Sequence, residues 1–155
     1  MKTLFIMRHG QAEPRAASDS ERTLTQRGEA DVHQMITSLT DELVGLEHVW
    51  TSPYRRARQT AAIVNEVLDR GAEPVLTDLL VPEAGVEPLC EQIQTCQESS
   101  LMLVSHMPLV GELLHYLTGA EPGRYSMGTS SVACVAVDVV AAGLGQLRWL
   151  HHREG

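Results

Sequence analysis

The sequence predicts an α/β fold: a three-layer α/β/α sandwich with a mostly parallel central sheet and an antiparallel edge. Short apolar runs alternate along the chain with segments of helical apolar spacing, which is typical of a parallel sheet covered by helices. Two apolar runs follow each other near the C-terminus and indicate a hairpin at one edge of the sheet. The 155 residues contain no linker, repeat or low-complexity tract, so one domain over residues 1–155 is expected.

The first part of the chain contains two expected strands and a helix. The apolar run Thr3–Met7 suits a strand buried on both faces. After a polar loop, Thr25 is the expected N-cap of a helix that ends at Gly45. This helix carries apolar residues at helical spacing, namely Val32, Met35, Ile36, Leu39 and Leu43. His48–Thr51 is expected to be the second strand.

The middle of the chain contains a helix and a weak strand. Ser52-Pro53 is typical of an N-cap followed by a first-turn proline. The helix that they begin ends at Gly71 and has one apolar face, made of Ala57, Ala61, Val64 and Leu68. Pro74–Thr77 is expected to be a short strand.

The remainder contains two helices, a strand and the hairpin. Pro88 begins a helix with Leu89, Ile93 and Cys96 on one face. Leu101–Ser105 is an apolar strand. Pro108 begins a helix whose apolar residues are Leu109, Val110, Leu113, Leu114 and Leu117. Val132–Val140 and Gln146–Leu150 form the expected hairpin.

The charge of the chain excludes some classes of function. The net charge is −8, and all of it lies in residues 59–155, because residues 1–58 hold eight basic and eight acidic side chains. A protein this acidic lacks the basic face that nucleic acids require. Eleven of the twelve basic residues are arginines, which recognise oxyanions with a forked pair of donors.

Membrane and secretory classes are also disfavoured. No apolar stretch reaches the roughly 18 residues of a membrane-spanning helix, and the N-terminal apolar run is too short for a signal-peptide core. The three cysteines, Cys90, Cys96 and Cys134, contain no CxxC pair. Neither a disulfide framework nor a structural zinc site is therefore expected, and the expected location is the cytoplasm.

Three of the expected strands end in residues with unusual chemistry. The first ends in Arg8-His9-Gly10, the second in Ser52-Pro53-Tyr54-Arg55-Arg56, and the strand Leu101–Ser105 in His106. Ligands of open α/β sheets bind at the C-terminal ends of the strands. If these strands are neighbours, two imidazoles and at least two guanidinium groups meet at one edge of the sheet.

His9 is the candidate nucleophile of this cluster. It follows a buried strand, and Gly10 leaves room for a close approach of backbone or ligand. Histidine can form covalent intermediates, and arginines such as Arg8 and Arg56 neutralise a phosphoryl group during its transfer. Alone, His9 could be a loop histidine without function, and the neighbouring arginines favour the catalytic interpretation.

The other polar residues of these segments are interpreted as follows. His106 is a candidate second hydrogen-bond donor to a phosphate group. The alternative is that it is only a histidine at the entry of a helix. Arg55 and Arg58 flank Arg56 on the helix and are expected to face solvent. No HExxH, GxxxxGK[ST] or GxGxxG occurs, so neither a metal site nor a nucleotide-binding loop is expected.

These blocks, in this order, resemble the histidine phosphatase (phosphoglycerate-mutase-like) superfamily. The similar segments are Arg8-His9-Gly10, Ser52-x-x-Arg55-Arg56-Ala57-x-Gln59-Thr60-Ala61 and Ser105-His106. The short length, together with residues 16–25 and 105–111, is similar to the SixA-type phosphohistidine phosphatases within it. The resemblance covers nearly the whole chain and implies the phosphoglycerate-mutase-like fold.

The resemblance also implies roles for the site residues. His9 would be phosphorylated, and Arg8, Arg56 and His106 would bind the phosphoryl group. Water would then hydrolyse phospho-His9. The arginine and histidine side chains would supply the charge that a metal ion supplies elsewhere, so no cofactor is expected.

Three further residues keep alternative interpretations. Arg22 is a candidate for the phosphate site, with an ion pair to Glu21 or Asp19 as the equal alternative. Many superfamily members use a carboxylic acid to protonate the leaving group, and Glu83 and Asp19 are the candidates here. Phosphohistidine phosphatases of this size tend to lack that acid, because the labile P–N bond and the imidazole leaving group need little acid help. The alternative for Glu83 is an exposed loop acid.

The size of the chain indicates the class of substrate. Larger members of the superfamily carry long insertions over the site, and this chain has only short loops there. An open pocket would admit a phosphorylated side chain, so the expected partner is a phosphohistidine-bearing protein such as a phosphotransfer domain or a phosphocarrier. The alternatives are a small-molecule phosphomonoesterase, a phosphoglycerate-type mutase and a phosphate-binding module without catalysis.

Overall fold

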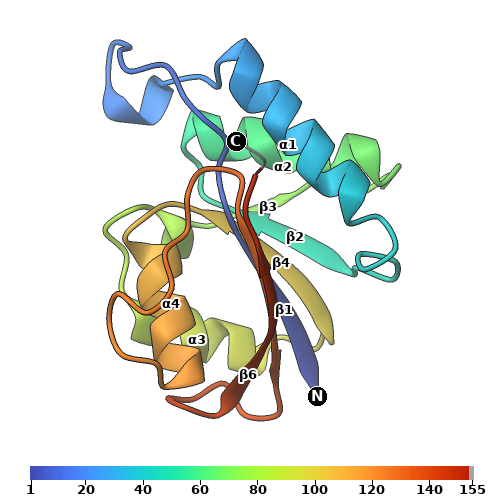
Figure 1. The fold of residues 1–155 in the computed structure, drawn as a ribbon, viewed down its shortest axis with the longest axis vertical. Helices are drawn as coiled ribbons and strands as arrows, with labels where there is room; N and C mark the ends of the chain where they lie inside the picture. Colours follow the sequence, from blue (N-terminus) through green and yellow to red (C-terminus); the bar gives the residue numbers. More distant parts are fainter. Residues whose placement is uncertain (154–155) are drawn as a thin grey trace.

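A six-stranded sheet with the strand order β3-β2-β4-β1-β5-β6 runs through the molecule (Figure 1). The computed structural model describes residues 1–153. Its strands are β1 (Lys2–Arg8), β2 (His48–Thr51), β3 (Val75–Leu76), β4 (Ser100–Ser105), β5 (Val132–Val137) and β6 (Gly145–His151). Its helices are α1 (Gln26–Ser38), α2 (Arg55–Val67), α3 (Val86–Thr95) and α4 (Leu109–Thr118), with short 3₁₀ helices η1 (Asp19–Glu21) and η2 (Asp78–Leu80).

The pairing of the strands confirms the predicted sheet. β1, β4, β2 and β3 are neighbours in parallel, and β5 pairs antiparallel with both β1 and β6. The hairpin β5–β6 therefore forms the antiparallel edge. Because β2, β4 and β1 lie side by side and run the same way, the residues that follow them gather at one edge of the sheet.

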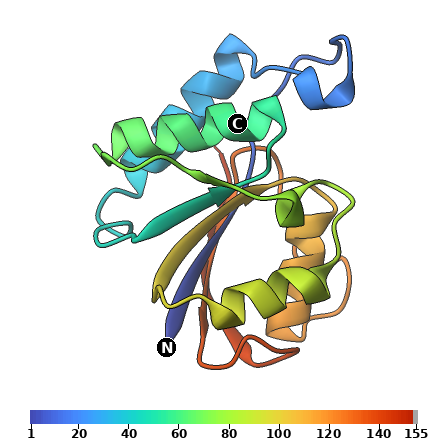
Figure 2. The ribbon, with the colours of Figure 1, turned by 180° about the vertical axis from the view of Figure 1, so that it is seen from behind.

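Helices cover both faces of the sheet (Figures 1 and 2). Successive residues of a strand point to opposite faces, and in β1 Leu4 and Ile6 pack into a different core cluster from Phe5 and Met7. The cluster with Leu4 contains the apolar residues of α3 and α4, and the cluster with Phe5 contains those of α1 and α2. Both faces of β1 are buried, as its continuous apolar sequence predicts.

The ends of several elements differ from the prediction. The helix α1 ends at Ser38 and does not continue to Gly45, because the N–H of Leu39 bonds to the carbonyl of Ile36 and the chain turns. Leu39 and Leu43 nevertheless stay buried in the core. The helix α2 begins at Arg55 with Tyr54 as its N-cap residue, so the predicted cap at Ser52 is wrong.

In the second half of the chain, the ends of the elements differ less from the prediction. The helix α3 begins at Val86, two residues before Pro88, which is tolerated because the N–H groups of a first helical turn have no partner within the helix. The strand β5 ends at Val137, not Val140. The predicted weak strand is reduced to Val75–Leu76, and both of its side chains are exposed at the sheet edge.

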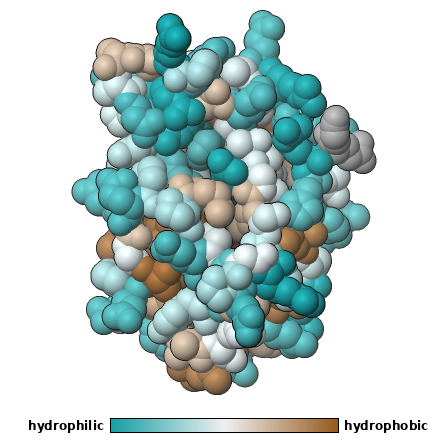
Figure 3. Space-filling view, turned by 60° about the vertical axis from the view of Figure 1, so that its left-hand side comes forward, coloured by the Kyte–Doolittle hydropathy of each residue, from teal (hydrophilic) through white to brown (hydrophobic). Residues whose placement is uncertain are grey.

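The face of the protein drawn in Figure 3 is mainly polar. On the face seen in Figure 3, hydrophobic side chains lie in separate small groups among hydrophilic ones. Met107, at the start of the segment leading into α4, is one of the large apolar side chains that are exposed. Within residues 1–153, no helix combines the length and the apolar character needed to cross a membrane.

Candidate active site

The three strand ends meet as the sequence predicts. His9 directly follows β1, His106 directly follows β4, and Ser52 directly follows β2. The backbone N–H of His9 donates to the carbonyl of Ser105 at 3.0 Å, which extends the pairing of β1 and β4 by one residue. The imidazole rings of His9 and His106 lie edge to face, with centroids 5.0 Å apart.

His9 is held in one orientation and one tautomer. Its Nδ1 lies 2.7 Å from the carbonyl oxygen of Gly10. A carbonyl only accepts, so Nδ1 carries the proton and Nε2 is unprotonated. Burial lowers the pKa of His9 to about 4, against the effect of the Gly10 hydrogen bond and with a further contribution from Arg56. The ring is therefore neutral at pH 7, with its lone pair on Nε2.

The segment after His9 is tied to α2. A Cβ on Gly10 would lie 2.7 Å from the side chain of Val32 and 2.9 Å from the carbonyl oxygen of Gly28, so only glycine fits. The N–H of Gly10 donates to Oγ1 of Thr60 at 3.1 Å, and that hydroxyl donates to the carbonyl of Arg56 at 2.8 Å. Thr60 thus connects the backbone of Gly10, beside His9, to the backbone of Arg56.

Arg56 lies in the first turn of α2 and is only 4% exposed. Its Nε donates to Nε2 of His9 at 3.3 Å. Its Nη1 donates to the backbone carbonyl of Asp19 at 2.7 Å, and its Nη2 lies 3.2 Å from the Asp19 carboxylate. Arg55 and Arg58 are exposed, as predicted.

Arg8 and His106 complete the cationic and polar wall around His9. Nη1 of Arg8 donates to the carbonyl of Met127 at 3.0 Å, while its buried Nε has no partner within the described chain. Burial, followed by the charge of Arg56, lowers the pKa of Arg8. His106 is 1% exposed, and burial, followed by His9 and Arg56, lowers its pKa to about 3.

Arg22 and Asp19 belong to the loop after β1, and Asp19 contacts Arg56. Nη1 of Arg22 is 2.8 Å from one carboxylate oxygen of Asp19, and Arg56 approaches the other oxygen. The ion pair that was one of the two alternatives for Arg22 is thus present. The hydrogen bond from Arg22, with the charge of Arg56, holds the pKa of Asp19 below its usual range, so this carboxyl is ionised at neutral pH.

Glu83 lies apart from this cluster. Its side chain is exposed in the turn after η2, and no hydrogen bond or ion pair joins it to another residue of the described chain. The loop that contains Glu83 is attached to β4 at Leu80, three residues earlier. There the hydroxyl of Ser105 donates to the carbonyl of Leu80 at 2.6 Å. Its role as proton donor stays a prediction.

Some residues at the site have no role assigned from the sequence. Ser52 was interpreted as a helix cap, and its hydroxyl instead contacts His106. Thr60 carries no chemical signal of its own in the sequence. Ser130 is fully buried, and its N–H donates to the carbonyls of Arg8 and His9, both at 3.1 Å. Only the fold brings these residues to the strand ends.

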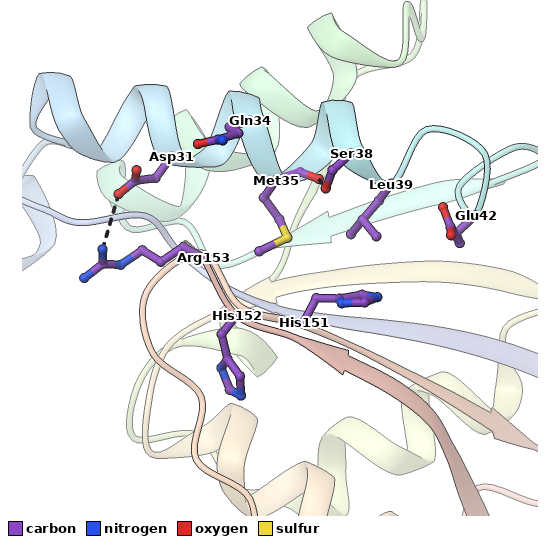
Figure 4. A pocket seen from close by; sticks show the side chains of 9 residues that line it. All are labelled: Asp31, Gln34, Met35, Ser38, Leu39, Glu42, His151, His152 and Arg153. Carbon is purple, nitrogen blue, oxygen red and sulfur yellow. Dashed lines mark hydrogen bonds and ion pairs between the residues drawn. The ribbon is translucent and has the colours of Figure 1, made fainter. Parts of the chain in front are cut away.

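One cavity lies away from His9. A pocket of about 330 Å³ is found between α1 and the C-terminal end of β6, with Met35 and Leu39 beside the polar side chains Asp31 and Arg153 (Figure 4). It includes none of the residues that surround His9. Within residues 1–153, no group of three or more His, Cys, Asp or Glu side chains is arranged to hold a metal ion.

The chain is similar in sequence to histidine phosphatases. The family model of the histidine phosphatase superfamily (branch 1) matches residues 4–81. The phosphohistidine phosphatase SixA of Escherichia coli (strain K12) is 35% identical over 150 residues, covering 94% of this chain and 91% of that protein. A phosphohistidine phosphatase SixA homolog of Haemophilus influenzae is 32% identical over 126 residues, covering 75% of this chain and 77% of that protein.

Solved structures show the same fold. The protein histidine phosphatase SixA complexed with tungstate matches with a TM-score of 0.87 and 34% identity, covering 97% of this chain and 96% of that chain. A mycobacterial glucosyl-3-phosphoglycerate phosphatase matches with a TM-score of 0.73 and 16% identity, covering 95% of this chain and 97% of that chain. The second similarity shows the fold alone.

Proposed function

The chain belongs to the histidine phosphatase superfamily, and from that premise we propose that it is a metal-independent protein phosphohistidine phosphatase. The observation that carries the proposal is the state of His9. Its Nδ1 proton is bonded to Gly10, its Nε2 lone pair faces Arg56 at 3.3 Å, and its pKa is about 4. A neutral, oriented imidazole beside guanidinium groups is suited to attack an anionic phosphoryl group.

The reaction has two halves. In the first, Nε2 of His9 attacks the phosphorus of a phosphohistidine on the partner protein, and a new N–P bond forms as the P–N bond of the substrate breaks. The partner's imidazole leaves and takes up a proton. In the second, water attacks the phosphorus of phospho-His9, the N–P bond breaks, and inorganic phosphate and free His9 are released.

The surrounding residues bind the transferred group. Arg8, Arg56 and His106 supply N–H donors for the three phosphoryl oxygens, and the two guanidinium groups balance its charge. Arg22 is a further candidate, which would leave its ion pair with Asp19 to bind the phosphoryl group. Glu83 and Asp19 stay candidates for protonating the leaving group, although Asp19 is ionised at neutral pH and would first have to take up a proton in the complex. An imidazole leaving group needs little such help. The SixA relative that binds tungstate, a tetrahedral oxyanion, supports this interpretation of the site.

The protein nature of the substrate is supported by the form of the molecule. Around His9 the walls come from the loop with η1 and from residues 119–131, and no inserted domain in the described part of the chain, residues 1–153, stands over them. Two curated relatives are described as a phosphohistidine phosphatase SixA and its homolog. The net charge of −8 disfavours nucleic acid as the partner. We place the protein in the cytoplasm, where its free cysteines, Cys90, Cys96 and Cys134, stay reduced.

The experiment compares phosphate release from a panel of phosphohistidine proteins and small phosphoesters, each with and without EDTA. We expect release from a phosphohistidine protein in EDTA and an acid-labile, base-stable phosphoenzyme. His9→Ala abolishes both, and His33→Ala, on the exposed side of α1, is the matched control. A strong preference for a sugar phosphate or a phosphoglycerate contradicts the substrate assignment. Vanadate binding without any turnover indicates a binding module.

A further inference from the structure

His106 has a buried hydrogen-bond partner that the reaction as described does not use. The hydroxyl of Ser52 lies 2.7 Å from Nε2 of His106. Ser52 is fully buried, and its own N–H donates to the carbonyl of Val104 at 3.0 Å. The pairing of β2 with β4 thus holds the serine beside the residue that follows β4.

The direction of this hydrogen bond follows from the other contact of the serine. The backbone N–H of Tyr54 donates to Oγ of Ser52 at 3.2 Å, and a backbone amide can only donate. The hydroxyl proton of Ser52 is then free to be donated. The acceptor within reach is Nε2 of His106, and if that nitrogen carried a proton the buried hydroxyl would have none. The structure therefore assigns Nε2 as the acceptor.

The state of the other ring nitrogen follows from the first. An imidazole that accepts at Nε2 and is neutral carries its proton on Nδ1, and the low pKa of His106, about 3, keeps it neutral. Nδ1 of His106 is buried and has no hydrogen-bond partner within the described chain. The ring lies 5.0 Å from that of His9, so a free N–H donor is buried beside the nucleophile.

We propose that Ser52 is a positioning residue: its hydroxyl donates to Nε2 of His106 and so holds that ring in the tautomer whose Nδ1–H binds the phosphoryl group. The second half of this statement rests on the proposed function. Without the serine, the Nε2–H tautomer becomes accessible, and in that tautomer Nδ1 presents a lone pair, which repels a phosphoryl oxygen. The role of Ser52 is therefore electronic as well as structural.

The test measures the tautomer directly, by two-bond ¹H–¹⁵N NMR correlation of the imidazole rings, with His106 assigned by its loss in His106→Gln. Wild-type protein is expected to show a protonated Nδ1 and an unprotonated Nε2. Ser52→Ala is expected to populate the Nε2–H tautomer, to weaken binding of orthovanadate and to lower kcat about tenfold or more. Ser105→Ala is the matched control, because it removes an equally buried hydroxyl one residue from His106 whose partner is the backbone carbonyl of Leu80.

The outcomes separate this proposal from the proposed function. A wild-type His106 protonated at Nε2 overturns the role of Ser52, and this measurement needs no variant that must fold. A Ser52→Ala variant with unchanged tautomer and unchanged vanadate affinity also overturns it. If Ser52→Ala does not fold, Ser52→Cys, with a weaker donor at the same place, is expected to give the same changes to a smaller extent. Absence of phosphohistidine hydrolysis in the wild type, with the expected ring spectrum, contradicts the proposed function alone.

Discussion

Nε of Arg56 lies 3.3 Å from Nε2 of His9, the atom that we assign as the nucleophile. Arg56 therefore contacts the reacting nitrogen from one side while the carbonyl of Gly10 holds the opposite side of the ring at 2.7 Å. The same guanidinium binds Asp19 through both of its terminal nitrogens. The contacts of this one arginine connect His9 to the first loop.

Arg56→Ala is expected to lower kcat for phosphohistidine hydrolysis about 100-fold to 1,000-fold, because it removes a buried donor to the charge that develops in the transition state. Arg55→Ala, its exposed neighbour in α2, is expected to change kcat little. Steady-state kinetics on both variants check this prediction. Equal losses in the two variants would assign the contribution to the general charge of the helix.

Asp19→Asn is expected to strengthen inhibition by inorganic phosphate, because the carboxylate competes with the phosphoryl group for Arg56 and Arg22. Glu21→Gln is the control, since the carboxylate of Glu21 lies in the same η1 helix but is bonded to Ser18. The inhibition constant for phosphate measures the effect. A large fall in kcat without stronger phosphate inhibition would instead support Asp19 as a proton donor.

Thr60→Val is expected to lower the free energy of unfolding by about 1–3 kcal/mol, because the N–H of Gly10 loses its acceptor in a buried place. The variant is also expected to lower kcat, since Thr60 joins the backbones of Gly10 and Arg56. Thr60→Ser keeps the hydroxyl and is expected to retain most of kcat. Chemical denaturation and kinetics measure the two effects, and identical kcat values in both variants would show that the hydroxyl does not position the site.

The free energy of unfolding is expected to fall as the pH decreases from 6.5 towards 4. The pKa values of His9 and His106 are lowered to about 4 and about 3 in the folded protein. The unfolded chain therefore binds more protons in this range, and each histidine removes about 1.4 kcal/mol per pH unit. His106→Gln is expected to show a shallower decrease between pH 6.5 and 5 in denaturation experiments. An unchanged slope would contradict a lowered pKa for His106.

Most of the fold could be predicted from local patterns. The continuous apolar runs of β1 and β4 indicate strands buried on both faces, and both are central in the sheet. The predicted ends of helices and strands were less accurate, because local hydrogen bonds decide where an element ends. Leu39, for example, continues the apolar spacing of α1, yet its N–H bonds to Ile36 and ends the helix.

The candidate site could be predicted in part. Arg8, His9, Arg56 and His106 carry side chains whose chemistry is visible in the sequence, and the structure brings all four together. Ser52 and Thr60 lie in a segment that resembles the superfamily, but their roles could not be found in this way, because a serine before a helix or a threonine within one has an ordinary structural explanation. Their contacts with His106 and Gly10 depend on strands and helices that are distant in the sequence.

The sequence by itself determined which side chains are present: two histidines and two arginines, at or after the ends of three strands. The tertiary structure decided the state of these groups. His9 is neutral because the fold buries it, and its free nitrogen is Nε2 because Gly10 accepts from Nδ1. The physical reason is that a protonation state depends on the solvent, charges and hydrogen bonds around a ring, and these come from residues that only the folded chain brings together.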